Sequence, residues 1–171
     1  KIRPVPDSRF LYYPDHSLLN CRLGYIQRLS NLPRGHSKGG NLAVYAGAKC
    51  GELVRERILD VYNFDDPGFT QWMLEEPGYR KIVPRVKTFL PQFSVFGLML
   101  EREESYRVIR SEGTGILQHE PYHWQVLGRG FVPGGELSER SLFLDKTLTA
   151  WLEGLSNEER SDFFDSLFEL L

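Results

Sequence analysis

The spacing of apolar residues separates an irregular N-terminal part of the chain from a more regular remainder. Residues 1–35 contain four prolines and keep no period of 2 or 3.6 residues for long, although 23–29 is compatible with a short helix. Regular patterns begin at residue 39. We therefore expect a single domain over residues 1–171, in which 1–34 is irregular and 35–171 carries the fold.

The regular part alternates between helical and extended patterns. Residues 39–49 predict a helix with a face of small side chains, which would let its backbone lie close to a sheet. Segments rich in β-branched and aromatic residues predict buried strands. The predicted strands are 58–64, 83–90 and 106–110, with short helical segments at 52–59 and 69–74 and a turn at 111–115. This alternation indicates a mixed α/β protein.

The C-terminal part predicts two helices. Apolar residues recur at helical spacing between 144 and 155, and Ser156 followed by Glu159 forms a capping box that starts a second helix. The apolar stripe of this second helix is more typical of a core than of a partner surface. Its members are Phe163, Phe164, Leu167, Phe168 and Leu171.

Composition excludes several classes of protein. Hydrophobic residues make up 41% of the 171 residues and charged residues 26%, which argues against disorder. The formal net charge of −2 shows no basic excess, so we expect no nucleic-acid partner. No apolar run approaches the ~20 residues of a transmembrane helix. The start shows no signal peptide and lacks an initiator Met, so we expect a cytoplasmic protein that is processed or a fragment.

The two cysteines, Cys21 and Cys50, form neither a disulfide framework nor a metal-binding spacing. Reduced thiols in the cytoplasm are the favoured interpretation, and a disulfide between the two is the alternative.

Residues 35–40, Gly-His-Ser-Lys-Gly-Gly, match the G-x-S-x-G nucleophile elbow. We expect Ser37 on a sharp strand-to-helix turn with a strained backbone, where side chains at Gly35 and Gly39 would collide with neighbouring backbone. The backbone N–H of Lys38 would be one oxyanion donor at the N-terminus of the following helix. The alternative is a glycine-rich helix cap with Ser37 as N-cap. A phosphate-binding loop does not fit, because the lysine follows the serine.

A serine nucleophile needs a base, and the chain offers four histidines. In α/β hydrolases the chain order is serine, acid, histidine, and His119 follows the third predicted strand, where the base belongs. His123 is the second candidate, on the same loop. His36, inside the elbow, is better suited to shaping the pocket. Pro121 interrupts a helical face between His119 and His123, which argues against a metal-binding pair.

The acid has two candidates. Its usual place follows the strand 83–90, but no carboxylate stands there. Asp65 and Asp66 follow the preceding strand, which is a known variant position for the acid. Either could orient His119, or both could simply form a turn before Pro67.

These blocks resemble a bacterial family of unknown function that is related to class 3 lipases and sometimes called Mbeg-like. The similar segments are 35–45 at the elbow, 61–69, 118–121 with Trp124, 151–152 and 158–160. The resemblance implies an α/β-hydrolase fold, with a mostly parallel sheet flanked by helices and with Ser37 and His119 as catalytic residues. It implies a lipase or esterase but names no substrate.

The region before the elbow departs from this family pattern. A buried strand of four or five apolar residues should precede Gly35, whereas residues 30–34 do not read as a strand. Family members also carry further strands and helices upstream, which include the second oxyanion donor. We therefore expect a sheet that is incomplete on its N-terminal side, and omitted segments between Asn20 and Gly35.

Two functions follow from these observations. The first is a serine hydrolase that acts on a small-molecule or lipid acyl ester through Ser37, His119 and Asp65 or Asp66, with the Lys38 N–H at the oxyanion and no metal or organic cofactor. The second is a non-catalytic binding module of the same fold, which the missing carboxylate after Leu90 favours. Oligomeric state has no signature in the sequence.

Overall fold

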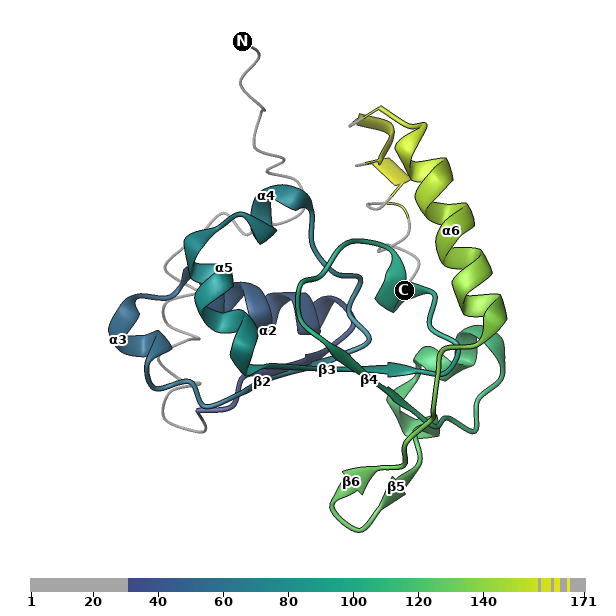
Figure 1. Cartoon of the computed structure of the whole chain (residues 1–171), viewed down its shortest axis with the longest axis horizontal. Coiled ribbons are helices and arrows are strands. Elements are labelled where there is room, and N and C mark those ends of the chain that lie inside the picture. The colour runs from purple at the N-terminus through teal and green to yellow at the C-terminus, as the bar shows by residue number, and fades with distance from the viewer. Residues whose placement is uncertain (1–30, 157, 161, 164–165, 167–171) are drawn as a thin grey trace.

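A computed structural model of the chain describes residues 31–156, 158–160, 162–163 and 166, and its arrangement is an α/β fold (Figure 1). Its main sheet has four strands in the order β1-β2-β3-β4, and every neighbouring pair is parallel. The strands are β1 (Arg34–His36), β2 (Val61–Phe64), β3 (Val86–Pro91) and β4 (Tyr106–Ile109). The compatible helix at 23–29, Cys21 and most of the segment from Asn20 to Gly35 lie outside the described residues.

The strand before the elbow corrects one expectation. Arg34–His36 forms a strand that pairs in parallel with β2, and the Tyr62 N–H donates to the Pro33 carbonyl at 2.9 Å. Sequence reasoning looked for a run of apolar side chains, but these ladder bonds require only extended backbone. The side chains of β1 are exposed or half-buried, so polar residues are tolerated there.

Helices cover one face of the sheet (Figure 1). The predicted helix is α2 (Lys38–Lys49), and on its predicted small-residue face Ala43, Gly47 and Ala48 are buried while Ala46 is half-buried. A second helix, α5 (Pro77–Ile82), packs against α2, and both contribute to a core with β2 and β3. Sequence analysis missed α5, because six residues are too few for a helical period and its proline at N1 reads as a breaker.

Two short helices lie in the connections of this layer. The structure has α3 (Glu52–Arg55) and α4 (Gln71–Leu74) where short helical segments were predicted. The first ends inside its predicted range of 52–59, and the second begins inside its predicted range of 69–74. The two central strands also begin three residues later than predicted, at Val61 and Val86, because residues 58–60 are irregular and Val83–Arg85 forms a 3-10 turn.

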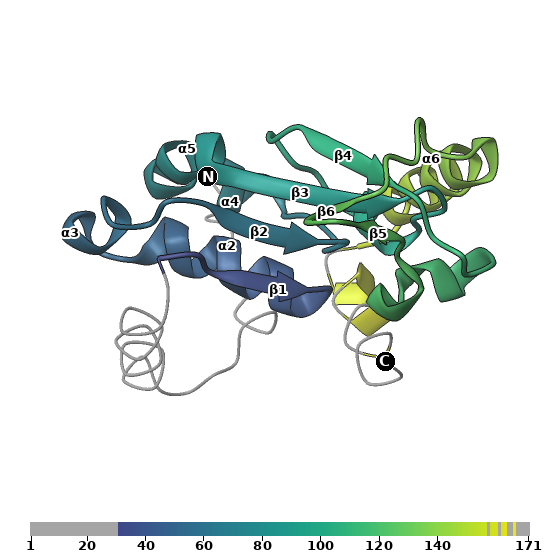
Figure 2. The same ribbon diagram turned by 90° about the horizontal axis from the view of Figure 1, so that it is seen from below.

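The opposite face of the sheet carries aromatic side chains. Tyr62, Phe64 and Phe89 stack along neighbouring strands, and Phe131 meets Phe89 with 5.3 Å between ring centroids. Phe131 belongs to a small hairpin of β5 (Val126–Leu127) and β6 (Gly130–Phe131), which Figure 2 shows beside this face. The hairpin was not predicted, because two-residue strands leave no readable alternation.

The C-terminal helix α6 (Glu139–Glu153) begins before the predicted stretch, with Ser138 as its N-cap. The predicted capping box is confirmed, since the Glu159 N–H donates to the Ser156 hydroxyl and the Ser156 N–H donates to the Glu159 carboxylate. Phe163 packs on Trp151, while the other members of the apolar stripe fall outside the described side chains. In the part of the chain that the structure describes, no helix is long and apolar enough to cross a membrane.

Candidate active site

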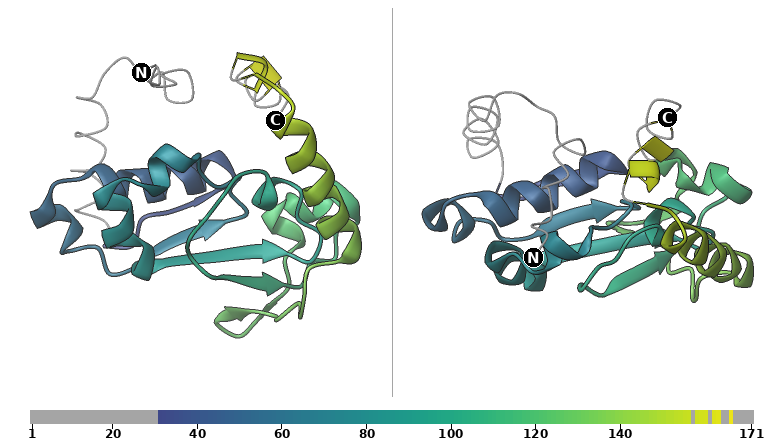
Figure 3. Two further views of the ribbon diagram at one scale, coloured as in Figure 1. Left: turned by 45° about the horizontal axis from the view of Figure 1, so that its top comes forward. Right: turned by 90° about the horizontal axis from the view of Figure 1, so that it is seen from above.

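The carboxyl ends of the four parallel strands meet at one edge of the sheet, as the arrowheads in Figure 3 show. Ser37 directly follows β1 and Asp65 directly follows β2. Ser94 lies three residues beyond β3, and His119 lies in the loop after β4. Parallel pairing therefore gathers residues that are up to 82 positions apart in the chain, because every strand delivers its next residue to the same edge.

The elbow has the predicted geometry. Ser37 stands between the last residue of β1 and the first residue of α2, with φ 52° and ψ −130°. A left-handed φ is costly for a residue with a side chain and persists only where surrounding bonds impose it. Those bonds are present, because the Ser37 N–H donates to the Phe64 carbonyl at 2.9 Å and its carbonyl accepts from Gly40 at 2.8 Å.

The glycines of the motif serve different purposes from those expected. A side chain at Gly35 would overlap the backbone carbonyl of Gly39, as predicted. Gly39 itself has open space around the position of a Cβ atom, so the expected collision there is wrong. Gly40 is the second constrained position, since a Cβ would strike the Asn63 side chain. The first turn of α2 leans onto β2 at Gly40 rather than at Gly39.

Of the two candidate acids, Asp65 is the one that meets His119. His119 Nδ1 lies 2.7 Å from Asp65 Oδ2, and both side chains are buried. The imidazole donates through Nδ1–H to the carboxylate, which leaves Nε2 as the acceptor that a general base requires. Asp65 shares with Ser37 a left-handed backbone, with φ 51°.

Asp66 points to a different neighbourhood. Its carboxylate forms an ion pair with Arg102 at 3.0 Å, and the same guanidinium donates to the carbonyls of Asp66 and Gly97. Asp66 is fully buried, and this burial raises the pKa of its carboxyl against the opposing attraction of Arg102. Asp66 therefore contacts Arg102 and not the histidine.

The serine and the histidine are not hydrogen-bonded to each other. Among the contacts of the described residues, no hydrogen bond joins the Ser37 hydroxyl to the His119 ring. Catalytic hydrogen bonds of this kind are often long in an unliganded site and tighten when substrate binds.

His36 and His123 occupy distinct positions. His36 Nε2 donates to the His119 carbonyl at 2.8 Å, and the two rings lie 4.4 Å apart between centroids. Burial, followed by the nearby His119, lowers the pKa of His36 and favours its neutral form. His36 thus packs against His119 at the site. His123 is exposed at the end of a 3-10 turn, and His16 lies outside the described residues.

Two further features of the site concern charge. Lys38 is the first residue of α2, so its N–H belongs to the helix N-terminus that follows Ser37. No group of three or more histidine, cysteine or acidic side chains in the described part of the chain is arranged to hold a metal ion.

Cys50 is a buried thiol that donates to the Gly47 carbonyl, and burial raises its pKa.

Sequence reasoning missed Ser94. Its hydroxyl donates to Asp65 Oδ1 at 2.5 Å and is fully buried. Its position after β3, the usual place of the acid, is the signal that the sequence offers for it.

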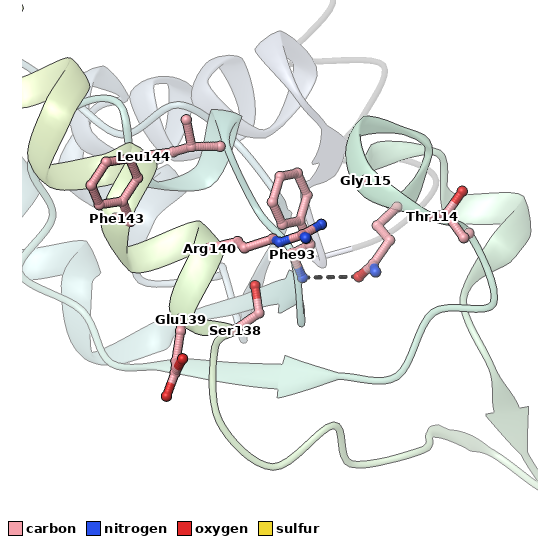
Figure 4. Close-up of a pocket in the computed structure, with 10 residues that line it drawn as sticks. Phe93, Thr114, Gly115, Ser138, Glu139, Arg140, Phe143 and Leu144 are labelled. Carbon is pink, nitrogen blue, oxygen red and sulfur yellow. Dashed lines mark hydrogen bonds between the residues drawn. The ribbon is translucent and has the colours of Figure 1, made fainter.

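A cavity of about 770 Å³ opens beside the histidine loop (Figure 4). It lies between α6 and the turn that leads to His119. Its apolar walls include Phe93 together with Phe143 and Leu144 of α6, and Arg140 of α6 also lines it. The Phe93 N–H donates to the Gln118 side chain at 2.9 Å, which ties the two walls together. The cavity is open to solvent, since Phe143 is largely exposed, and its lining includes neither Ser37 nor His119.

The comparisons with known proteins identify the family of the chain. No curated protein and no solved structure matches the chain. The model of the Mbeg1-like family matches residues 26–169, which is most of the 171 residues and includes every residue of the candidate site. The chain therefore belongs to the Mbeg1-like family.

Proposed function

We propose that this protein is a serine hydrolase that cleaves an acyl ester. The observation that supports this most strongly is the meeting of a strained serine elbow and a buried aspartate–histidine pair at one edge of the sheet. Strain at Ser37 is maintained by the surrounding backbone bonds, as is common where a nucleophile must be presented. A glycine-rich helix cap would need neither the strain nor the Asp65–His119 pair.

Acylation uses each group in one role. Ser37 Oγ attacks the ester carbonyl carbon while His119 Nε2 takes the hydroxyl proton, and Asp65 stabilises the imidazolium through Nδ1–H. The carbonyl oxygen becomes an oxyanion, to which the Lys38 N–H donates with the support of the helix N-terminus. The C–O bond to the leaving group then breaks, and His119 returns the proton to the departing alcohol.

Deacylation repeats these roles with water. A water molecule attacks the acyl carbon, His119 Nε2 takes a water proton, and the second tetrahedral intermediate releases the carboxylic acid as Ser37 recovers its proton. These acylation and deacylation steps need no metal and no organic cofactor.

The substrate class follows from the resemblance to class 3 lipases and from the cavity beside His119. We assign the apolar part of an acyl ester, from a lipid or a smaller molecule, to the cavity between α6 and the histidine loop. The cysteine usage suits a bacterial cytoplasmic enzyme, where thiols stay reduced.

A fluorophosphonate probe tests the proposal, because it reacts covalently with an activated serine. We expect labelling of the folded protein at Ser37 and hydrolysis of p-nitrophenyl esters. Both should vanish in Ser37→Ala and persist in Ser105→Ala, which removes an exposed serine away from the site. If the folded wild-type protein shows neither labelling nor turnover, it is a non-catalytic binding module instead.

Chain-length dependence tests the assignment of the cavity. Replacing Phe143 by Ala removes an apolar wall, so KM for p-nitrophenyl octanoate should rise by about tenfold while KM for the acetate ester stays unchanged. Leu53→Ala, an exposed leucine on α3, is the matched control and should alter neither value. An equal change with both esters would place the acyl chain elsewhere.

A further inference from the structure

Asp65 has two hydrogen-bonding partners, and only one of them is the histidine. Oδ2 accepts from His119 and Oδ1 accepts from the Ser94 hydroxyl, at 2.7 Å and 2.5 Å. A carboxylate that accepts a single hydrogen bond can still rotate about its Cβ–Cγ bond. Hydrogen bonds to both of its oxygens fix its plane. The partner of Oδ1 therefore decides how Oδ2 is presented to the imidazole.

The direction of the Ser94 hydroxyl is itself fixed. The Gly97 N–H donates to Ser94 Oγ at 2.9 Å, so one lone pair is occupied and the hydroxyl proton is left for Asp65. Gly97 is packed so tightly that a Cβ there would overlap Asp65 Oδ1 and crowd the Ser94 oxygen. The three residues form a closed arrangement in which the serine can donate to little else.

The C-terminal helix holds Ser94 from the other side. The Ser94 N–H donates to the Ser141 hydroxyl at 3.1 Å, and that hydroxyl in turn donates to the Ser94 carbonyl. Ser141 is fully buried in the first turn of α6, where its own N–H is capped by Ser138 at 3.1 Å. The contacts thus run without interruption from α6 through Ser94 and Asp65 to His119.

We propose that Ser94 is a positioning residue for the Asp65–His119 pair, and that α6 anchors it through Ser141. This inference rests on the proposed hydrolase function. Ser94 occupies the place after β3 where an acid is more usual, and the acid has moved one strand back to Asp65. The serine then supplies the donor that orients the displaced carboxylate.

Two readouts test this role, of which one does not depend on catalysis. An imidazole N–H held by a carboxylate gives a low-field proton resonance. We expect that resonance in the wild-type protein, its loss in Asp65→Asn, and a clear shift or loss in Ser94→Ala. On ester substrates, Ser94→Ala should lower kcat by about 10- to 100-fold with KM unchanged, since a hydrogen bond to a charged group is removed away from the bound substrate.

Ser141→Ala is the matched control for a purely structural role. It removes the anchor on α6 but keeps the Ser94 hydroxyl, so it should lower Tm and shift the low-field resonance less than Ser94→Ala does. Ser94→Cys keeps a weaker donor and should lose less of kcat than Ser94→Ala, which also covers the case in which the alanine variant folds poorly.

An unchanged resonance together with an unchanged kcat in folded Ser94→Ala would overturn the positioning role. The same holds if Ser94→Ala and Ser141→Ala lose only stability, and by equal amounts. If the wild-type protein hydrolyses no ester, the proposed function fails, and the resonance still decides whether Ser94 orients Asp65.

Discussion

Asp65 and Asp66 are neighbours in sequence, both fully buried, and yet they belong to two different regions of the molecule. Asp65 faces the edge of the sheet, where each of its carboxylate oxygens accepts one hydrogen bond. Asp66 instead forms an ion pair with Arg102, which is its main partner. The left-handed φ of Asp65 turns the chain between them, so the two side chains diverge.

The comparison shows that a buried carboxylate can either orient a side chain at the candidate site or join elements of the core. Around Asp65, the Ser94 hydroxyl donates to one carboxylate oxygen and the His119 imidazole donates to the other. Around Asp66, a second buried acid also lies within reach of the same arginine: Glu104, at 3.6 Å from the guanidinium, accepts from Tyr79 and Thr88. The first arrangement is suited to chemistry, and the second joins β2, β3 and α5 into one core.

The sharpest test of this difference is the loss of one charge at a time. Asp65→Asn should lower kcat for ester hydrolysis by about 10⁴-fold, because an amide cannot hold His119 in the required tautomer. The fold should survive, since asparagine tolerates a left-handed backbone. Asp66→Asn should keep turnover within about tenfold of the wild-type value. Equal losses of kcat in both variants would erase the distinction between the two regions.

Arg102→Ala tests the structural region. It leaves the Asp66 carboxyl buried without its cation and removes the donor to two backbone carbonyls, so the free energy of unfolding should fall by about 3 kcal/mol. Urea denaturation measures this loss. Lys87→Ala breaks a more exposed pair with Asp60 at 3.7 Å and should cost less than about 1 kcal/mol. Comparable losses would mean that the Asp66 ion pair contributes no more than a surface one.

Gly35→Ala tests the elbow side. The added methyl group would overlap the Gly39 carbonyl, so we expect a loss of about 3 kcal/mol in the free energy of unfolding, together with loss of turnover. Gly39→Ala meets open space inside a helix and should be neutral or stabilising by about 0.5–1 kcal/mol, with turnover retained. Thermal unfolding and ester assays on the pair check this, and a tolerant Gly35→Ala would contradict the close approach of β1 and α2.

The pH dependence of stability gives the smallest expected effect. Burial raises the pKa of Asp66, so the folded protein binds this proton more tightly than the unfolded chain does. The resulting stabilisation is fully present below the unfolded pKa of about 3.9 and is lost as the pH rises through the folded pKa. Asp66→Asn should therefore gain stability relative to the wild-type protein as the pH increases, by at most about 1.4 kcal/mol per pH unit. A constant difference measured by urea denaturation from acid to neutral pH would contradict the raised pKa.

Helix α2 and strands β2 to β4 could be predicted from local patterns in the sequence. Residues 39–49 carry a helical face of small side chains, and α2 forms there. The β-branched segments predicted β2 and β3 with starts three residues too early, and their predicted ends and both bounds of β4 fall within one residue of those observed. The elbow motif located Ser37, its strained turn and the close approach at Gly35, whereas the second constrained glycine is Gly40 and not the predicted Gly39. Short elements were missed, since α5 and the β5–β6 hairpin contain too few residues to show a period.

The sequence by itself determined α2, the three longer strands and the kinds of side chain available for chemistry. These are a serine elbow, a histidine after the third predicted strand, and two candidate acids. Only the tertiary structure decided between Asp65 and Asp66, and only it brought Ser94 and Ser141 into the site. The physical reason is that local backbone preference acts over a few residues. The partner of a buried carboxylate is instead set by strand register, by the turn at φ 51° and by helix packing, which join residues many positions apart.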